Sequence, residues 1–555
     1  MRFRTVIGSV LASTLVAGAG LLTTTPAAAR DTTTLIEGVT GLTDTAAAGG
    51  RVFVSANDRI VIADGRGAIT GTITGLANPT GLAVTPDGAR LYAALTGSGE
   101  VAEIDTTSLT VTRRIDLAAY PSPEHLSLAG DRLWVGYGVK GSFDGGVLGL
   151  DLSVPAPAPV QIATRMYGAP MVAAGGDTVV AGEAGINPGS LRVYDVRTAP
   201  ATLRGTISGS QHGLSNLTDL TVTPDGATAI SVFATSGFDV WDTTTLAKVR
   251  TYGTEAEYPG SPGAVALSAD GAHVAGAFYG SMYSPYATVY DAATAEKTYQ
   301  TNVTNNASLR TGSLSVLGDD LFALQEDRQR NRYYLWRVEG ATLPASTLTL
   351  TAETGATALA PFSLTGRLAF TDGSAPGAQP LEITRTLPDG TTVLLPAVTT
   401  AADGTFRVTD TPPVGGAVTY GALWDGSPTF RWSKITTTVD VVRHATTLTL
   451  TGPSIASAGR PIQLTGVLGT AGAVPTPAGS VVVWRDVTTR SGTTSTDLPP
   501  VRLAADGSFT VTDTPPTSGQ YRYHVRFDGD ATFALAHDSH DISVRGAIVG
   551  TYTHR

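Results

Sequence analysis

The feature that most constrains the fold is a dipeptide in which an apolar or aromatic residue precedes aspartate. It recurs along the first 345 residues with successive aspartates 41, 46, 44, 47 and 49 residues apart, and a further 46 residues lead to a degenerate copy that ends in arginine. The copies are Ala63-Asp64, Ile104-Asp105, Leu150-Asp151, Tyr194-Asp195, Trp241-Asp242, Tyr290-Asp291 and Trp336-Arg337. A period near 45 residues with short strands and no helical pattern is typical of a β-propeller, in which each repeat forms one four-stranded blade.

The repeat unit is clearest at 79–117. Its first strand leads into the turn Thr85-Pro86-Asp87-Gly88, in which Pro fixes φ and Gly supplies a positive φ. The same turn returns at 223–226, and a Ser-Ala-Asp-Gly version occupies 268–271. An aspartate that begins a tight turn caps the backbone N–H groups two and three residues on, so the recurrent aspartates are interpreted as structural and not catalytic.

This pattern of strand, TPDG turn, strand and aromatic-Asp-Thr resembles the bacterial seven-bladed propellers of the YVTN repeat type, which are related to the WD40-like group. The resemblance covers 31–344 and implies a seven-bladed ring. It implies no single activity, since propellers include lyases, lactonases, dehydrogenases and adaptors. Because the last repeat supplies only three strands, we expect 32–37 to pair with it as its outer strand and so remove an exposed edge.

A different repeat begins after residue 345, where the composition turns rich in threonine. Thr-Leu-Thr-Leu-Thr at 347–351 returns at 447–451, and Val-Thr-Asp-Thr-Pro-Pro at 408–413 returns at 511–516. The offset of 100 to 103 residues is the size of one β-sandwich, so two consecutive sandwiches are predicted.

The end of the second copy, Phe-Asp-Gly-Asp-Ala-Thr-Phe at 527–533, resembles the closing stretch of bacterial Ig-like repeat domains. The resemblance implies two tandem Ig-like β-sandwiches, at 346–443 and 444–545, followed by a tail at 546–555. The first copy lacks an aspartate equivalent to Asp530, so Asp530 is interpreted as a turn residue beside an aromatic anchor and not as a ligand. The predicted fold class is thus all-β throughout.

The first 29 residues have the features of a secretory signal peptide. Arg2 and Arg4 form a basic start, 6–22 is an apolar stretch, and an Ala-x-Ala site predicts cleavage after Ala29. We therefore expect a secreted, extracellular protein, released or held non-covalently at the cell surface without an integral membrane anchor. The sequence has no cysteine, which excludes thiol catalysis, haem attachment and thiolate metal sites.

The charge balance narrows the class of partner. Without the two leader arginines, 35 basic and 47 acidic residues remain, a net charge of −12. A surface of this sign disfavours nucleic acid and anionic lipid, so the expected partner is a protein or a cell-envelope glycan.

Sequence motifs for common catalytic chemistry are missing. There is no zinc motif, phosphate loop, dinucleotide fingerprint, Gly-x-Ser-x-Gly elbow or Asp-rich calcium loop. His537 and His540 are the only close histidine pair, and no third ligand lies near them in the sequence. No catalytic residue, metal ligand or cofactor is therefore assigned.

Long loops are concentrated on one face of the predicted propeller, opposite the TPDG turns. They span 140–145, 183–189, 278–286 and 325–332, and the segments that enter each blade reach the axis on the same face. Long loops on one face favour a binding surface. The alternative interpretation is that the polar groups near the axis only line a water-filled channel. The candidate binding residues are Glu124, His125, Tyr167, His212, Glu257, Tyr258, Tyr283, Arg310, Arg328 and Arg330.

Two functional hypotheses follow. The first is a non-catalytic recognition or adhesion-type protein, in which the propeller binds its partner and the Ig-like modules act as spacers. The second is a propeller enzyme of the lyase or lactonase type, with His125 or His212 acting beside Glu124, Glu257 or a loop-bound metal. An enzyme needs acid–base groups that converge within hydrogen-bond reach, and a binding protein does not.

Overall fold

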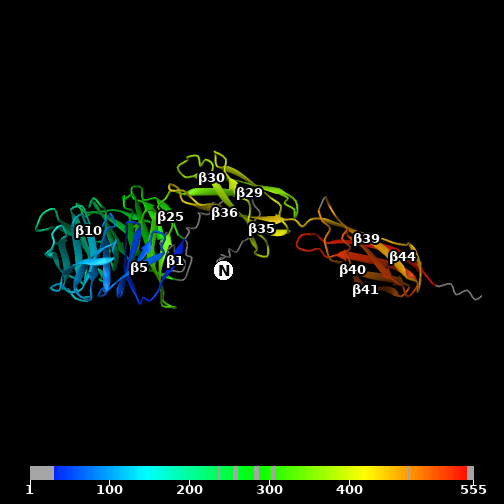
Figure 1. Ribbon diagram of the computed structural model, residues 1–555, viewed down its shortest axis with the longest axis horizontal. Coiled ribbons are helices and arrows are strands. Elements are labelled where there is room, and N and C mark those ends of the chain that lie inside the picture. Colours follow the sequence, from blue (N-terminus) through cyan, green and yellow to red (C-terminus); the bar gives the residue numbers. More distant parts are fainter. Residues whose placement is uncertain are drawn as a thin grey trace, which may run out of the picture. The chain divides into compact units, whose positions relative to one another are not determined.

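The computed structural model describes residues 31–234, 237–253, 261–279, 287–301, 307–472 and 474–546. This part is almost entirely β, with one short helix, α1 (Gly209–His212) (Figure 1). None of its helices has the length and apolarity that crossing a bilayer requires. The signal peptide predicted at 1–29 lies outside the described residues.

The chain divides into two compact units. Among the described residues, one unit consists of 31–345 together with the short segment Gly426–Trp432, and the other comprises Ser346–Asp425 and 433–546.

Four-stranded antiparallel sheets make up the first unit. The first sheet in chain order consists of β2 (Leu42–Ala48), β3 (Arg51–Ala56), β4 (Arg59–Asp64) and β5 (Ile69–Thr74). The next consists of β6 (Pro79–Val84), β7 (Arg90–Leu95), β8 (Glu100–Asp105) and β9 (Thr110–Asp116). It is followed by the sheet of β10 (Pro123–Ala129), β11 (Arg132–Tyr137), β12 (Gly145–Asp151) and β13 (Val160–Met166).

Four further sheets complete the unit in the described residues. They are β14 (Met171–Gly175), β15 (Thr178–Gly182), β16 (Leu191–Asp195) and β17 (Thr202–Ile207); β18 (Leu217–Val222), β19 (Thr228–Phe233), β20 (Phe238–Asp242) and β21 (Lys248–Tyr252); β22 (Ser261–Leu267), β23 (His273–Tyr279), β24 (Ala287–Asp291) and β25 (Lys297–Gln300); and β26 (Ser308–Leu317), β27 (Asp320–Asp327), β28 (Arg332–Val338) and β1 (Thr32–Ile36).

The first strand of each sheet lies against the first strand of the next. The contacts run from β2 to β6, β10, β14, β18, β22 and β26, and from β26 back to β2. A ring of four-stranded sheets with their first strands innermost is a β-propeller, so the fold predicted from the 45-residue period is confirmed.

The N-terminal strand belongs to the last sheet, as predicted. β1 pairs antiparallel with β28, from Thr32 opposite Arg337 to Ile36 opposite Tyr333. Ile36 is 4% exposed and packs in one apolar cluster with Val52 and Tyr333. The two ends of the propeller sequence therefore share one sheet, which covers the edge that β28 would otherwise expose.

The recurrent aspartates act as turn caps. The N–H groups of Thr244 and Thr245 donate to Asp242 Oδ1 at 2.9 and 2.7 Å. Asp105 and Asp291 accept the same pair of bonds from the residues two and three positions on. These bonds stabilise the charged carboxylate and lower the pKa of Asp242. The structural interpretation of these aspartates is confirmed.

Neighbouring sheets are held together by the apolar side chains between them. Phe53 and Ile60 of the sheet that begins with β2 pack with Leu91 and Ile104 of the next sheet, and all four side chains are fully buried. These residues come from central strands, whose two faces are both covered, and this accounts for their near-continuous apolar runs.

The second unit contains two pairs of sheets, each pair with one three-stranded and one five-stranded sheet. The first pair is formed by β29 (Ser346–Ala352), β30 (Phe362–Phe370), β31 (Pro380–Thr386), β32 (Thr392–Leu394), β33 (Val398–Thr399), β34 (Thr405–Asp410), β35 (Gly416–Trp424) and β36 (Ser433–Val441). The second pair is formed by β37 (Thr446–Thr451), β38 (Ile455–Ser457), β39 (Ile462–Thr470), β40 (Ser480–Thr489), β41 (Gly492–Arg502), β42 (Ser508–Asp513), β43 (Gly519–Phe527) and β44 (Ala536–Arg545).

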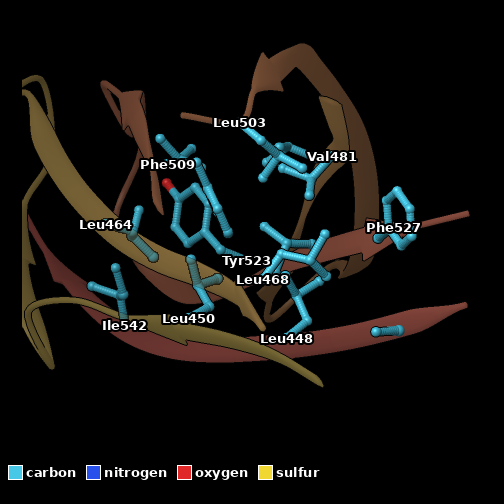
Figure 2. Close-up of a cluster of buried hydrophobic side chains, with 14 of the residues drawn as sticks. Leu448, Leu450, Leu464, Leu468, Val481, Leu503, Phe509, Tyr523, Phe527 and Ile542 are labelled. Atoms are coloured by element: carbon cyan, nitrogen blue, oxygen red, sulfur yellow. The ribbon is translucent and has the colours of Figure 1, made fainter. Parts of the chain in front are cut away.

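The core of the second pair of sheets lies between its two layers. Leu450 and Leu464 from the three-stranded sheet face Tyr523 and Ile542 from the five-stranded sheet (Figure 2). In the closing turn, Asp530 Oδ1 accepts the N–H groups of Thr532 and Phe533, each at 2.7 Å, as the turn interpretation predicted.

One polar cluster is repeated in both pairs of sheets. Arg385 donates to Asp410 at 2.8 Å, and the Tyr420 hydroxyl donates to the same carboxylate at 2.7 Å. In the second pair, Arg485 and Tyr523 make the same two contacts with Asp513. The repetition of this cluster at matching positions indicates that it belongs to the fold.

Candidate functional site

A cavity of about 690 Å³ lies among the inner strands of the propeller. All these strands run in the same direction, so their first residues meet at one mouth and their last residues at the other. Thr43, Thr80 and Thr218 line the first mouth, and Val84, Leu128, Ser268 and Ser315 line the far end. The cavity is therefore polar at the mouth where each blade begins, which is also the face of the long loops.

Irregular pairing shapes the polar mouth. The inner strands β2, β10 and β18 shift register near their starts, between Leu42 and Thr45, between Pro123 and His125, and between Leu217 and Asp219. A β-bulge re-aims the side chains beside it. The bulges lie where Asp44, Glu124, His125 and Asp219 line the cavity.

Asp44 and Asp219 occupy equivalent positions on two sheets. Asp44 Oδ2 accepts the N–H of Leu82 from the next inner strand at 2.8 Å, and Asp219 Oδ2 accepts the N–H of Val265 at 2.8 Å. The other oxygen of each carboxyl accepts the N–H of the residue that follows it. Each carboxyl thus joins two neighbouring sheets at the cavity mouth.

Burial alters the protonation of both carboxyls. It raises the pKa of Asp44 and that of Asp219 from 3.8 to about 7, while the backbone N–H donors act in the opposite direction. The charge of Asp44 adds slightly to the rise in the pKa of Asp219. These groups therefore change protonation near neutral pH.

Glu124 and His125 line the same mouth from β10. Burial lowers the pKa of His125, and the nearby charge of Glu124 opposes that shift. The backbone here is packed tightly, since a Cβ on Gly81 would lie 2.3 Å from the Glu124 carbonyl oxygen. Among the hydrogen bonds and ion pairs of the described residues, none joins Glu124 or His125 through its side chain to Asp44 or Asp219.

Arg310 lines the cavity from β26 and lies near the arginines of the 325–332 loop. Its guanidinium pairs with Glu326 at 3.2 Å, and Arg328 approaches the same carboxylate at 3.6 Å. Arg330 pairs with Asp327 at 3.2 Å. The side chains of Arg328 and Arg330 are 80% and 72% exposed, so both face solvent at the rim.

The 140–145 loop contributes an exposed aromatic side chain on this face. Phe143 is 62% exposed, and its ring meets that of Tyr167 edge to face with centroids 5.2 Å apart. The loop is tied to the segment that enters the next blade, because Gly168 N–H donates to the Ser142 carbonyl oxygen at 2.8 Å. Tyr167 itself is half-buried and is not among the residues that line the cavity.

His212 lies apart from the cavity. It ends helix α1, is exposed, and packs edge to face against Trp241 with ring centroids 5.0 Å apart. Neither Tyr167 nor His212 lines the cavity, although the segments that enter each blade were expected to reach the axis. Glu257, Tyr258 and Tyr283 lie outside the described residues.

Asp44 is a cavity residue that the sequence analysis did not identify. Its signal is the tripeptide Leu-Thr-Asp, which occurs at 42–44 and again at 217–219, just before two inner strands enter their regular pairing. Within the described residues, no group of three or more His, Asp or Glu side chains is arranged to hold a metal ion. The cavity mouth is thus polar and titratable, with its two aspartates bonded to backbone.

Comparisons with known proteins find matches among solved structures. No family model and no curated protein matches the chain. Among solved structures, it is similar to Kuenenia stuttgartiensis hydrazine synthase, with 19% identity and a TM-score of 0.42. It is also similar to the β-propeller domain of Cps50 (Swd1) from Myceliophteria thermophila, with 16% identity and a TM-score of 0.42. Each match covers 55% of this chain and 99% of the other.

Proposed function

We propose that the protein is a secreted, non-catalytic recognition protein whose propeller binds a macromolecule with its loop face. The observation that carries the proposal is the rim of that face, where Phe143, Arg328 and Arg330 are all more than half exposed. Aromatic and arginine side chains are enriched at protein interfaces because they combine contact area with directional hydrogen bonds. A protein is therefore the favoured partner, with a cell-envelope glycan as the second choice.

The arrangement at the cavity mouth supports binding over catalysis. Each carboxyl of Asp44 and of Asp219 accepts a backbone N–H from a neighbouring inner strand, which favours a role in holding adjacent sheets together. Among the hydrogen bonds of the described residues, none joins these carboxyls to Glu124 or His125, whereas an enzyme needs acid–base groups that converge. The alternative, a lyase or lactonase acting at the axis, is favoured by the half-buried His125 beside Glu124 in the same cavity.

We also propose the finer description of the fold. The ring would be a seven-bladed propeller of the YVTN type that is closed by β1, and the second unit would be two tandem Ig-like sandwiches. Support comes from the even repeat, the ring of inner strands and the repeated pairs of sheets. The Ig-like modules then act as spacers between the propeller and the surface to which the protein is held, and export is proposed from the sequence of 1–29.

A pull-down from envelope and secreted fractions tests the proposed function. The variant with Phe143→Ala, Arg328→Ala and Arg330→Ala should lose the partner that the wild-type chain retains. A matched control replaces two exposed arginines at the opposite face, Arg66→Ala and Arg197→Ala, and should retain it. Equal recovery by the wild type and the rim variant would reject the loop face. A hydrolase or lyase activity that His125→Ala abolishes would establish the enzyme alternative.

A further inference from the structure

The last five-stranded sheet carries a cluster of aromatic and charged side chains on its outer face. Trp484 of β40 and His524 of β43 are direct cross-strand partners, and their rings stack with centroids 4.7 Å apart and planes 5° apart. His524 Nε2 lies 3.1 Å from Asp486 Oδ2, and the Arg526 guanidinium lies 5.8 Å from the Trp484 ring centroid. These four residues are called the Trp484 platform.

The platform is present in only one of the two copies. The buried cluster around Tyr523 recurs around Tyr420, and the registers agree, since Arg485 faces Tyr523 and Arg385 faces Tyr420. At the adjacent pair of the ladder, Trp484 faces His524, whereas Thr384 faces Gly421. The fold thus forms without the platform in the first copy.

The exposure of Trp484 distinguishes it from the other tryptophans of the chain. The chain has six, all at positions that the structure describes, and five of them are no more than 7% exposed. Trp484 is half-buried, with its indole on the solvent side of the sheet. The part of the indole that His524 does not cover therefore offers an apolar surface with a polar N–H beside solvent, which suits an amphipathic ligand.

This face carries two ion pairs within the sheet and two carboxylates beside the platform. Arg522 pairs with Asp541 at 2.7 Å and Arg526 pairs with Asp528, while Asp486 lies beside His524 and the exposed Asp497 of β41 faces Trp484. An anionic ligand would be repelled by these carboxylates and would have to break the ion pairs, so it gains little from the surface. A ligand rich in hydroxyl groups can instead bond to carboxylate and guanidinium groups that are already held in place.

We propose that the Trp484 platform binds a neutral oligosaccharide. The C–H face of a sugar ring packs on the exposed part of the indole, and its hydroxyl groups donate to Asp486 and accept from Arg526. The inference goes beyond the function proposed for the propeller, because it assigns a second binding site to a different unit. Failure of either proposal leaves the other standing.

Fluorescence and calorimetry of the full-length chain test the proposal. The probes are maltohexaose, cellohexaose, laminarihexaose and chitohexaose, with heparin as a charged comparison. At least one neutral hexasaccharide should change the tryptophan fluorescence saturably, because Trp484 is the tryptophan open to solvent. By calorimetry, Trp484→Ala and Asp486→Asn should each weaken that binding at least about tenfold, as expected for an anchoring contact.

The first copy provides the matched control. Thr384→Ala changes the position equivalent to Trp484 and should leave the affinity unchanged. Asp486→Asn is a conservative exchange outside the core, so it tests the site even if Trp484→Ala perturbs the sheet. The proposal is overturned if no neutral hexasaccharide binds, if both platform variants bind as tightly as the wild type, or if only heparin binds.

Discussion

At the scale of single residues, Asp44 and Asp219 combine a structural and a titratable role. Each carboxyl accepts a backbone N–H from the next inner strand, yet burial raises the pKa of both to about 7. Bonds from N–H groups favour the charged form, and burial in the cavity favours the neutral form. In these two residues burial has the larger effect.

The stability of the propeller should therefore depend on pH through these two residues. Because the folded carboxyl has the higher pKa, it binds its proton more tightly than the unfolded chain does, so stability falls as the pH rises from about 4 to 7. A rise in pKa from 3.8 to about 7 corresponds to about 4 kcal/mol at a fully buried site, and because both carboxyls are only half-buried, solvent screening reduces the expected effect to about 1–2 kcal/mol for each residue. Urea unfolding of the Asp44→Asn, Asp219→Asn variant should show a flatter pH profile, and an unchanged profile would contradict the assignment.

A second residue-scale prediction concerns the cluster that both copies share. Tyr523→Phe removes a hydrogen bond from a buried hydroxyl to the Asp513 carboxylate and should lower the free energy of unfolding by about 1.5–3 kcal/mol. Tyr420→Phe should cost a similar amount through Asp410. Thermal unfolding of the two variants measures both. A loss in only one copy would argue against a shared structural role.

At the scale of elements, the position of β1 explains how the ring of sheets is completed. Its five residues each face a residue of β28, and Ile36 is buried against the first sheet of the ring. Deletion of 31–38 should expose the edge of β28 and lower the melting temperature of the propeller by about 5 °C or more, which corresponds to roughly 2 kcal/mol for a unit of this size. Deletion of 547–555 controls for truncation. A melting temperature equal to that of the wild type would show that β1 is dispensable.

The elements were largely predictable from the sequence, and the site was only partly so. The TPDG turns and the aromatic-Asp pairs depend on local backbone geometry, so the turns expected at 85–88 and 223–226 do lie between the first and second strands of their sheets. The cavity depends on bulges at the starts of inner strands, and the shared tripeptide Leu-Thr-Asp marks only those of β2 and β18. For this reason Glu124, His125 and Arg310 were placed correctly at the cavity, Tyr167 and His212 were not, and Asp44 was missed.

The position of His212, away from the cavity, shows the physical reason. A segment that enters a blade can run along the axis or fold back over the sheet, and the choice is set by packing, here of His212 on Trp241 of the same sheet. The Trp484 platform was missed for a similar reason, since the contact of Trp484 with His524 requires the register of two strands 40 residues apart.

At the scale of the whole molecule, the second unit should fold without the propeller. Its cores are built from its own strands, with Leu464 and Tyr523 in one and Leu364 and Tyr420 in the other among the fully buried residues. A fragment of residues 346–545 should therefore give a cooperative unfolding curve of β type. An aggregated or unfolded product would place the boundary elsewhere.

The central claim is that the loop face of the propeller, and not the opposite face, meets the partner. A photoreactive benzoylphenylalanine introduced at position 143 probes the loop face, and the same residue at position 66 probes the turn face. In cells that produce the protein, irradiation should yield a discrete cross-linked adduct from position 143 and none from position 66. Adducts from position 66 alone, or from neither position, would contradict the claim.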